Sequence, residues 1–306
     1  MSKHILVIGS INMDLTIYVK KYPVIGETII GKNFTLSPGG KGANQAVACS
    51  KLGADVIMLG CVGNDVYGDS LINSMNSYGV DTTHIEVVNG SSGIAMITVC
   101  DGDNSIILSD GANAKVDRNL LDKNNNLFKW ADIVLLQFEV PMETVIYGAK
   151  LAKLNGAKVY LNPAPMKSFP LELLRYIDVF VPNQTETEIL LNQKINTLND
   201  AEVAIKKLEK MFVKQAIITM GENGSVFNDG ESVKRQDVFS VDVIDTTSAG
   251  DSFIGGLAVT DDKAIMESVK YATAVSALAV TKKGAQISIP TEVETNEFVK
   301  NFKKYR

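Results

Sequence analysis

The chain has few of the residues that build disulfide frameworks or histidine-based catalytic sites. It contains three cysteines, which are widely spaced and odd in number, and two histidines, His4 and His84, neither of which lies within a motif. A disulfide framework and a thiolate metal site are therefore not expected, and a reducing cytoplasm fits best. A Ser/His/Asp triad and a histidine-rich zinc site are excluded on the same ground, so any general base is expected to be a carboxylate.

The chain also lacks a membrane-spanning run and an excess of positive charge. Its best apolar stretch, at residues 272–280, is followed at once by polar residues and lysines, and the N-terminus has no secretory signal pattern. In 306 residues, 30 lysines and arginines stand against 35 aspartates and glutamates, giving a net charge of −5. Neither nucleic acid nor a membrane surface is an expected partner, and small molecules are favoured.

Apolar, β-branched runs alternate with amphipathic segments through most of the chain. With 45% apolar residues, the chain can bury a large core. Strands buried on both faces that alternate with helices indicate a three-layer α/β/α fold with a mostly parallel central sheet. The predicted strands are residues 4–9, 55–60, 132–138, 157–162, 177–182 and 215–220, and the predicted helices are residues 42–53, 66–79, 142–156 and 201–212.

Two regions break this alternation. Residues 14–37 and 93–109 resemble strands joined by turns at residues 22–26 and 101–104. They could extend the main sheet with antiparallel strands, or form a small lid that closes over a site or pairs with another subunit. No internal repeat or interdomain linker is present, so residues 1–306 are expected to form a single domain with a lid.

Polar and glycine-rich segments follow the predicted strands. In an open parallel sheet, ligands bind beyond the carboxyl ends of the strands, so these segments are expected to converge at one edge. They are Asn12, Asp14, Glu139 and residues 162–165, 183–186, 219–224 and 245–251.

The glycine cluster at residues 39–42 opens a predicted helix and carries Lys41, with Asn44 just behind it. It matches neither a G-x-x-x-x-G-K-[ST] phosphate loop nor a G-x-G-x-x-G fingerprint. A structural cap is one interpretation, but a lysine and an amide beside the glycines favour a ligand site. Residues 219–224 could likewise be only a tight turn.

Asn183 and Glu186 admit two interpretations. Their spacing is that of a helix N-cap with a partner at the third helical position. The same spacing would let them orient water around magnesium, which keeps several waters when it bridges nucleotide phosphates. The sequence leaves both open.

The segment 245-DTTSAGDSF-253 follows a predicted strand at residues 238–244 and precedes an apolar helix. The N–H groups of Ala249, Gly250 and Asp251 would point out of the helix N-terminus, where they could bind an anion. Asp251 taken alone could simply complement the helix dipole. A carboxylate beside an anion pocket repels phosphate, however, which favours a chemical role such as accepting a proton from an attacking hydroxyl.

In this order and spacing, these segments resemble the ribokinase-like carbohydrate kinases of the phosphofructokinase-B family. The matching stretches are 9-GSINMD-14, 26-GET-28, 39-GGKGANQAVA-48, 162-NPAP-165, 182-PNQTE-186, 245-DTTSAGDSF-253 and 283-KGAQISIP-290. The resemblance implies a ribokinase-like fold and phosphoryl transfer from ATP to a sugar, with the 5-hydroxyl of D-ribose the expected acceptor. A sibling kinase for deoxyribose, another sugar or a nucleoside is the alternative. An oxidoreductase is disfavoured because no G-x-G-x-x-G follows a strand.

The resemblance also implies roles for individual residues, with Asp251 as the catalytic base and Ala249 and Gly250 beside it in an anion hole. The sugar would be bound by Asn12, Met13, Asp14, Gly40, Lys41, Gly42, Ala43, Asn44, Glu139 and Asp251. The nucleotide would be bound by Asn183, Thr219, Met220, Gly221, Glu222, Asn223, Gly224, Gly250, Asp251 and Thr273.

The cofactors that the resemblance implies are ATP, magnesium and a monovalent cation, expected to be potassium. Magnesium would travel with ATP, with Asn183 and Glu186 organising its waters. The expected protein partner is a second copy of the chain, in a homodimer formed through the lid strands. The potassium site would comprise Asp245, Thr247, Ala279, Lys282, Gly284 and Ser288, mostly through carbonyl oxygens.

Overall fold

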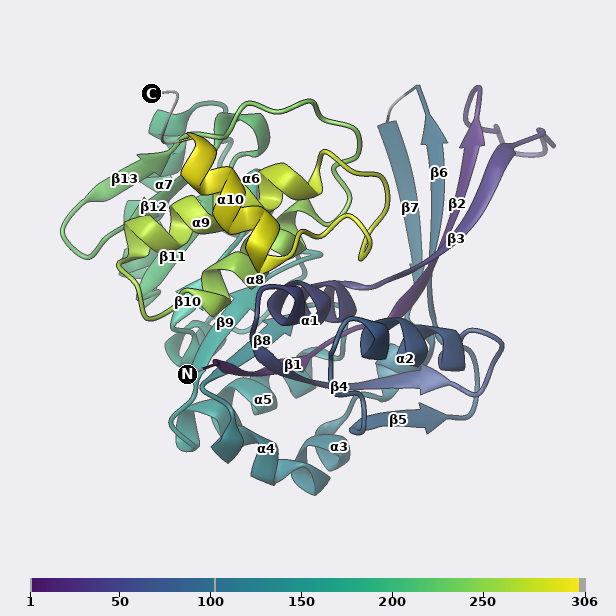
Figure 1. The fold of residues 1–306 in the computed structure, drawn as a ribbon, viewed down its shortest axis with the longest axis horizontal. Coiled ribbons are helices and arrows are strands. Elements are labelled where there is room, and N and C mark those ends of the chain that lie inside the picture. The colour runs from purple at the N-terminus through teal and green to yellow at the C-terminus, as the bar shows by residue number, and fades with distance from the viewer. Residues whose placement is uncertain (1, 102, 303–306) are drawn as a thin grey trace.

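The computed structural model describes residues 2–101 and 103–302, which form a nine-stranded and a four-stranded sheet (Figure 1). The large sheet has the strand order β13-β12-β11-β10-β9-β8-β1-β4-β5. Its strands pair in parallel except at the β11–β12 and β12–β13 hairpins, so the predicted mostly parallel sheet is confirmed. The strands are β1 (His4–Ile8), β4 (Asp55–Gly63), β5 (Ile85–Val88), β8 (Ile133–Gln137), β9 (Lys158–Asn162), β10 (Val179–Phe180), β11 (Gln215–Thr219), β12 (Ser225–Asn228) and β13 (Val233–Gln236).

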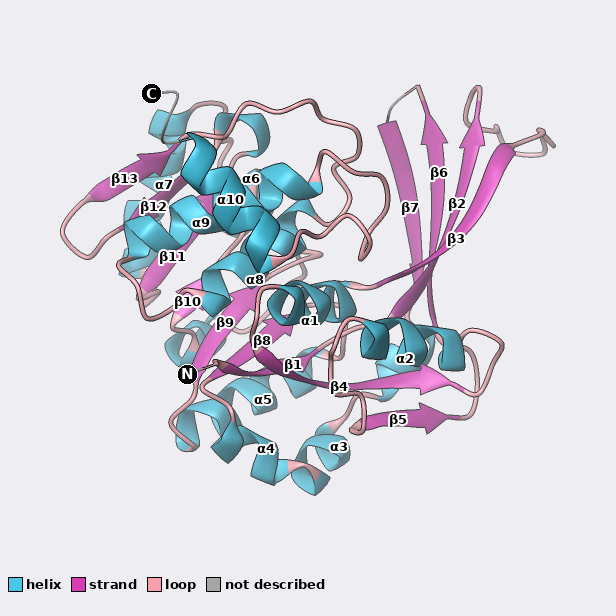
Figure 2. Cartoon of the chain, in the orientation of Figure 1, coloured by secondary structure: helices cyan, strands magenta, loops and turns pink. Residues whose placement is uncertain are grey.

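Helices cover both faces of this sheet, because alternate side chains of each central strand point to opposite sides (Figure 2). Leu6 and Ile8 of β1 belong to a core on one face of the sheet, together with residues of α3 (Arg118–Lys123), α4 (Asn125–Trp130), α5 (Met142–Leu154) and α7 (Leu198–Lys210). Ile5 and Val7 belong to the core on the other face, with residues of α1 (Lys41–Lys51), α2 (Gly68–Ser77), α8 (Ala249–Val259) and α9 (Ile265–Ala279). The three-layer α/β/α prediction is therefore confirmed. The remaining α-helices are α6 (Gln184–Leu191) and α10 (Glu292–Phe302).

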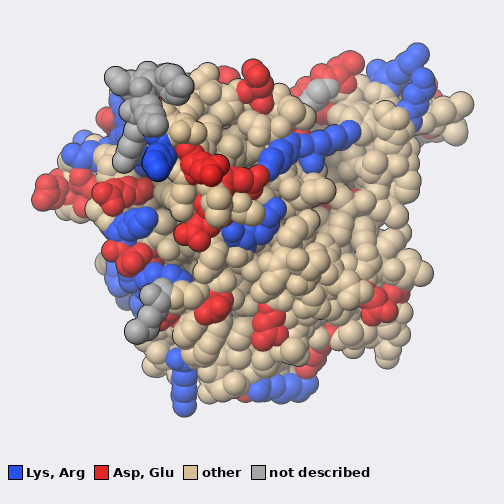
Figure 3. All heavy atoms as spheres, in the orientation of Figure 1, with Lys and Arg blue, Asp and Glu red and all other residues tan. Residues whose placement is uncertain are grey.

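The second sheet projects from the body beside the carboxyl edge of the large one, and we call it the lid. It has the order β3 (Lys32–Gly39), β2 (Asn12–Val19), β6 (Gly93–Cys100), β7 (Asp103–Ser109). The two outer pairs are antiparallel, and β2 pairs with β6 in parallel. The two strand-rich regions thus form a sheet of their own and do not extend the main one. In Figure 3, charged side chains gather over the body around α10 and β13, and a further group lies at the tip of the lid.

One predicted strand is wrong. Residues 238–244 alternate in polarity, yet they form an irregular segment in which Val243 and Ile244 are exposed. Alternation alone does not specify a partner strand, and the edge of the sheet is formed instead by β13, which pairs with β12 along its whole length. The other predicted strands and helices are present with shifted ends, although the strand expected at residues 177–182 is reduced to β10. No helix within the described ranges is long and apolar enough to span a membrane.

Candidate active site

A pocket of about 220 Å³ opens at the carboxyl edge of the large sheet, where α1 and α8 begin. Strands β9 and β11 also end at this pocket, through Asn162 and Thr219. The segments that follow separate predicted strands therefore do converge, as the sheet rule requires. Predicted site residues in its lining are Lys41, Asn183, Glu186, Thr219, Ala249, Gly250 and Asp251.

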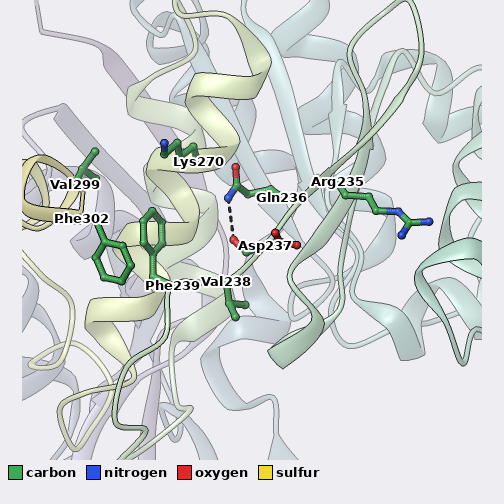
Figure 4. A pocket seen from close by; sticks show the side chains of 8 residues that line it. All are labelled: Arg235, Gln236, Asp237, Val238, Phe239, Lys270, Val299 and Phe302. Carbon is green, nitrogen blue, oxygen red and sulfur yellow. Dashed lines mark hydrogen bonds between the residues drawn. The ribbon is translucent and has the colours of Figure 1, made fainter. Parts of the chain in front are cut away.

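A larger cavity, of about 390 Å³, lies between the segment after β13 and the helices α9 and α10 (Figure 4). Phe239 and Phe302 line it, and Arg235 points away from them toward Glu202, to which its Nε donates at 2.7 Å. A Cβ added at Gly224 would lie 2.1 Å from the carbonyl oxygen of Gln236, so this cavity adjoins the 219–224 turn. It contains none of the convergent carboxylates, so the reactive groups belong to the smaller pocket.

The N-terminus of α8 presents free N–H groups to the smaller pocket. The N–H of Ala249 donates to the carbonyl of Thr246 at 3.2 Å. The N–H groups of Gly250 and Asp251 donate to no residue within the described ranges. A Cβ added at Gly250 would meet nothing within 4 Å, so open space faces these groups. This end of the helix can therefore take an anion.

Ser248, just before α8, is the cap residue of that helix. Its backbone is left-handed, with φ 62°, and its buried Oγ has no hydrogen-bond partner within the described ranges. A glycine would adopt this conformation without strain, and a serine tolerates it at a modest cost. Ser248 is thus accommodated without closing the anion site.

The carboxylate of Asp251 is held by two amides from the first turns of α1. Asn44 Nδ2 donates to Oδ2 at 3.0 Å, and Gln45 Nε2 donates to Oδ1 at 3.1 Å. Asp251 is only 6% exposed, so these contacts leave a small reactive surface directed at the pocket. The Oδ1 of Asn44 is buried and accepts no hydrogen bond within the described ranges. It is therefore free to accept one from a ligand hydroxyl.

Lys41 is surrounded by carboxylates. Burial alone would lower the pKa of Lys41, but Asp251, Glu139, Glu186 and Asp14 together raise it above its ordinary value. The lysine is therefore firmly protonated at neutral pH. Its single charge does not balance the four neighbouring carboxyl groups, so a polyphosphate entering this site would need an additional cation. The residues thus fit a divalent metal that arrives with its anion.

Asp14 is the most perturbed of these carboxyl groups. Burial, then Glu139 and Asp251, raise the pKa of Asp14 to about 7, against a partial lowering by Lys41. No N–H or O–H group within the described ranges donates to its carboxylate, although the residue is only 8% exposed. A buried carboxylate without a donor costs free energy unless a ligand supplies one. Asp14 therefore has the properties of a hydroxyl-binding residue.

Asn12 and Glu139 flank Asp14 and are fixed by neighbours. Asn113 Nδ2 donates to Asn12 Oδ1 at 2.7 Å, which leaves the Asn12 amide N–H groups for a ligand. Ser10 Oγ donates to Glu139 Oε2 at 2.5 Å. Of the other predicted sugar-binding positions, Gly40 caps α1 and Gly42 lies in its first turn, whereas the side chains of Met13 and Ala43 are buried in the core. Only the backbone of those two residues can face a ligand.

Asn183 and Glu186 form a complete capping box at the start of α6. Glu186 N donates to Asn183 Oδ1, and Asn183 N donates to Glu186 Oε2, both at 2.8 Å. The helix-cap interpretation is therefore confirmed. The cap also holds the Glu186 carboxylate at the pocket, and burial, reinforced by Asp251, raises its pKa. A carboxylate held there suits water-mediated contact with a divalent cation.

The residues predicted to hold a monovalent cation come together behind the α8 turn. Asp245 Oδ1 accepts from Thr247 N at 2.9 Å, and its Oδ2 accepts from Gly284 N at 2.9 Å. Although partial burial opposes it, these hydrogen bonds lower the pKa of Asp245. Lys282 directs its ammonium group to Glu294 at 2.8 Å, so only its backbone can face a cation. An ionised carboxylate beside a turn of carbonyl groups fits a hard monovalent ion.

The remaining residues that were predicted to bind the cation or the nucleotide lie in α9, in the segment after α9 and in the turn after β11. Ser288 is buried and donates from Oγ to the carbonyl of Ala285 at 2.8 Å, and Ala279 ends α9. A single 3-10 turn spans Gly221–Asn223, with Thr219 at the end of β11, Met220 just before the turn and Gly224 just after it. Thr273 is turned away, since its hydroxyl donates to the carbonyl of Val269 in its own helix at 2.7 Å.

Sequence reasoning missed several polar residues that organise this pocket, namely Ser10, Gln45, Asn113 and Gln137, whereas Asn162 lies in a segment that was expected at this edge. Gln45 offered a signal, because it is an uncharged polar residue inside the apolar run of α1 and is fully buried. Asn113 offered none, because its partner Asn12 is distant in sequence.

Comparison with known proteins agrees with this geometry. The pfkB family carbohydrate kinase model matches residues 2–292. The chain is 39% identical over 305 residues to a ribokinase of Haemophilus influenzae, and the alignment covers 98% of this chain and 100% of that protein. It is 37% identical over 300 residues to a deoxyribokinase of Salmonella typhi, with 96% and 98% covered.

Solved structures give the same result. The ribokinase of Thermotoga maritima superimposes with a TM-score of 0.87 at 36% identity, covering 97% of this chain and 99% of that one. The ribokinase of Arabidopsis thaliana, solved with ribose and ATP, gives a TM-score of 0.91 at 34% identity, covering 98% and 99%. The sequence resemblance is thereby confirmed, and the chain belongs to the pfkB family of carbohydrate kinases.

Proposed function

We propose that the protein transfers the terminal phosphoryl group of ATP to the 5-hydroxyl of D-ribose, giving ribose 5-phosphate and ADP. The observation that carries this proposal is the buried Asp251 carboxylate directly beside the free N–H groups of the α8 N-terminus. An acceptor for a proton and a binding site for an anion are thus adjacent, as in-line phosphoryl transfer requires. Relatives named ribokinase favour ribose among the family's sugars.

In the proposed mechanism, Asp251 removes the proton of the attacking hydroxyl. The sugar oxygen forms a bond to the terminal phosphorus, the bond from that phosphorus to the bridging oxygen breaks, and ADP leaves. Because the proton can depart late in a loose transition state, a carboxylate is a sufficient base. The N–H groups of Gly250 and Asp251 donate to the transferring phosphoryl group, and Lys41 adds a positive charge nearby.

Two cations complete the proposal. Magnesium bound with ATP would neutralise phosphate charge, and Asn183 and Glu186 would hold its waters. A potassium ion at Asp245, Thr247 and the 279–288 segment would act differently, since Asp245 already joins that segment to the α8 turn through Gly284. We infer that the monovalent ion stiffens this turn and so aims the N–H groups of α8 at the phosphate.

The sugar is proposed to bind between the lid and α1. Asn12, Asp14, Asn44 and Glu139 offer both donors and acceptors there, which suits a ring with vicinal hydroxyl groups. Deoxyribose is the second candidate, because a deoxyribokinase is among the relatives at 37% identity. A site with several polar groups for hydroxyls is more favourable to ribose, since a missing hydroxyl leaves a buried group unpaired.

We also propose that the protein forms a homodimer through the lid. Leu15 on β2 is directly paired with Leu36 on β3 and with Met96 on β6, and Met96 is paired with Ile107 on β7. These residues form an apolar row on the lid face opposite to Asp14. Leu36, Met96 and Ile107 are 50%, 57% and 67% exposed. Exposed apolar patches of this kind favour association.

A cytoplasmic location is part of the same proposal. The three cysteines, Cys49, Cys61 and Cys100, are free and buried. Free thiols are typical of proteins in reducing compartments.

The sugar assignment is tested by a coupled assay of ADP release with ribose, deoxyribose, fructose 6-phosphate and adenosine, each with and without potassium. We expect ribose to give the highest kcat/KM and potassium to raise the rate. A sugar-free reaction is the control for background ATP hydrolysis. Preference for deoxyribose would select the second candidate, and no response to potassium would reject the monovalent-cation site.

The base assignment is tested by Asp251→Ala and Asp251→Asn. We expect kcat to fall by about 100- to 10,000-fold with sugar binding largely retained, because the proton loses its acceptor. Ribose affinity is measured separately by calorimetry. If kcat decreases by less than tenfold in both variants, Asp251 is rejected as the base.

The pKa of Asp14 predicts a pH-dependent affinity for sugar. In the sugar-free protein this pKa is about 7, and hydroxyl donors favour the ionised form, so protons compete with the sugar. Ribose should therefore bind about tenfold more weakly at pH 6 than at pH 8, as measured by calorimetry without ATP. Asp14→Asn should bind weakly at both values, and a pH dependence that persists in this variant would contradict the assignment.

The raised pKa of Asp14 also predicts an effect on protein stability, which is opposite in sign to its effect on sugar affinity. Because the folded-state pKa of Asp14 lies above its unfolded value, its contribution to stability is present below pH 4 and is lost as pH rises through about 7. Asp14→Asn should therefore raise the free energy of unfolding at pH 8 by about 1–3 kcal/mol while weakening sugar binding.

The dimer is tested by Met96→Lys and Ile107→Lys, with light scattering after gel filtration. We expect a shift from dimer to monomer, because a charge would be buried in the apolar row. Val203→Lys, at an exposed position of α7, is the matched control and should remain dimeric. A wild-type monomer at micromolar concentration would contradict the proposal.

A further inference from the structure

A line of buried amides connects Asp251 to the ends of neighbouring strands. Gln45, in α1, is completely buried and contacts Asp251 Oδ1 through its Nε2 at 3.1 Å. The same nitrogen donates to Asn162 Oδ1 at 3.3 Å, at the end of β9. Its Oε1 accepts from Gln137 Nε2 at 2.6 Å, at the end of β8. Gln45 therefore uses its whole amide group in contacts with three different elements.

The direction of the Gln45 amide follows from Asn162, whose own amide is oriented by a backbone group. Asn162 Nδ2 donates to the carbonyl of Val181 at 3.0 Å, and a carbonyl can only accept. Asn162 must therefore offer its oxygen to Gln45. Gln45 in turn must offer its nitrogen to Asn162 and Asp251, and the Gln137 donor satisfies its oxygen. A reversed Gln45 would set an oxygen against both the Asp251 carboxylate and the Asn162 carbonyl, which is repulsive.

We propose that Gln45, itself held by Asn162 and Gln137, is the positioning residue of the catalytic base. The inference rests on the proposed role of Asp251 and extends it to a residue that does not line the pocket. Gln45 holds Oδ1, Asn44 holds Oδ2, and the carboxylate plane is thereby fixed relative to α8. The Asp251 side chain then needs no rotation before its Oδ2 accepts the proton of the attacking hydroxyl.

This arrangement predicts which kinetic parameter changes. Gln45 lies behind Asp251, so its loss should leave sugar and ATP binding nearly unaffected and reduce the fraction of complexes in which the base is aligned. Gln45→Met keeps most of the side-chain volume and removes both hydrogen-bonding groups. We expect a decrease in kcat of about 10- to 100-fold, with the KM values for sugar and ATP changed by less than about threefold.

A double-mutant cycle with Asp251→Ala separates positioning from a general structural effect. If Gln45 acts through Asp251, Gln45→Met should cause no further loss in the Asp251→Ala background. Gln215→Met is the matched control, because Gln215 is a half-buried glutamine with hydrogen bonds to Asn228 at the opposite end of β11, and it should retain wild-type kcat. Gln137→Met is the second variant if Gln45→Met does not fold, with an expected decrease of about three- to tenfold.

The inference is overturned if Gln45→Met retains kcat within threefold of wild type, or if its loss persists in full without Asp251. In the absence of folded Gln45→Met, an unchanged kcat for Gln137→Met overturns it. All rates are compared on whichever sugar of the panel the wild type accepts best. A wild type that prefers a sugar other than ribose would thus refute the ribose proposal and still measure the effect of Gln45.

Discussion

The close packing of α1 against α8 is the constraint on which the site depends. A Cβ added at Gly255 would lie 2.5 Å from the Cβ of Ala48, so the two helices approach as closely as their backbones allow. Both helices begin at the carboxyl edge of the sheet, and their first turns therefore share one pocket. Lys41 and Asn44 come from one N-terminus, and Gly250 and Asp251 come from the other. A larger residue at position 255 would separate the anion site from the sugar site.

Concentrating carboxyl groups at this edge reduces the stability of the ligand-free protein. Asp14 has no donor within the described ranges and Glu186 is buried, and the pKa of each is raised, which means that folding disfavours their ionised forms. Lys41 offsets only part of this repulsion. A purely structural site would replace such groups with apolar ones, since buried charges rarely stabilise a fold. The proposed ligands would offset this unfavourable charge, because a sugar brings hydroxyl donors and a nucleotide brings a metal cation.

The fold and most pocket residues could be predicted because they follow from local pattern. Strand periodicity gave the layers, and the rule for parallel sheets brought Lys41, Asn183 and Asp251 to one edge. The strand expected at residues 238–244 is absent because alternation by itself does not specify a pairing partner. Asn113 was missed for a related reason, because its importance lies in a contact with a distant segment, which has no local sequence signature. Gln45 carried a local signal as a polar residue inside an apolar run, but that signal did not identify its distant partners.

The lid and the cation segment are coupled to the same edge. The ammonium group of Lys283 lies 5.1 Å from the ring centroid of Tyr18 on β2, within the range of a cation–π contact. On its other side this segment is joined through Gly284 to Asp245, and so to the turn that begins α8. Asp14 lies on the same lid strand as Tyr18. A movement of the lid toward a bound sugar would therefore reach the α8 turn through residues 283–284, the segment at which we propose that a monovalent cation binds.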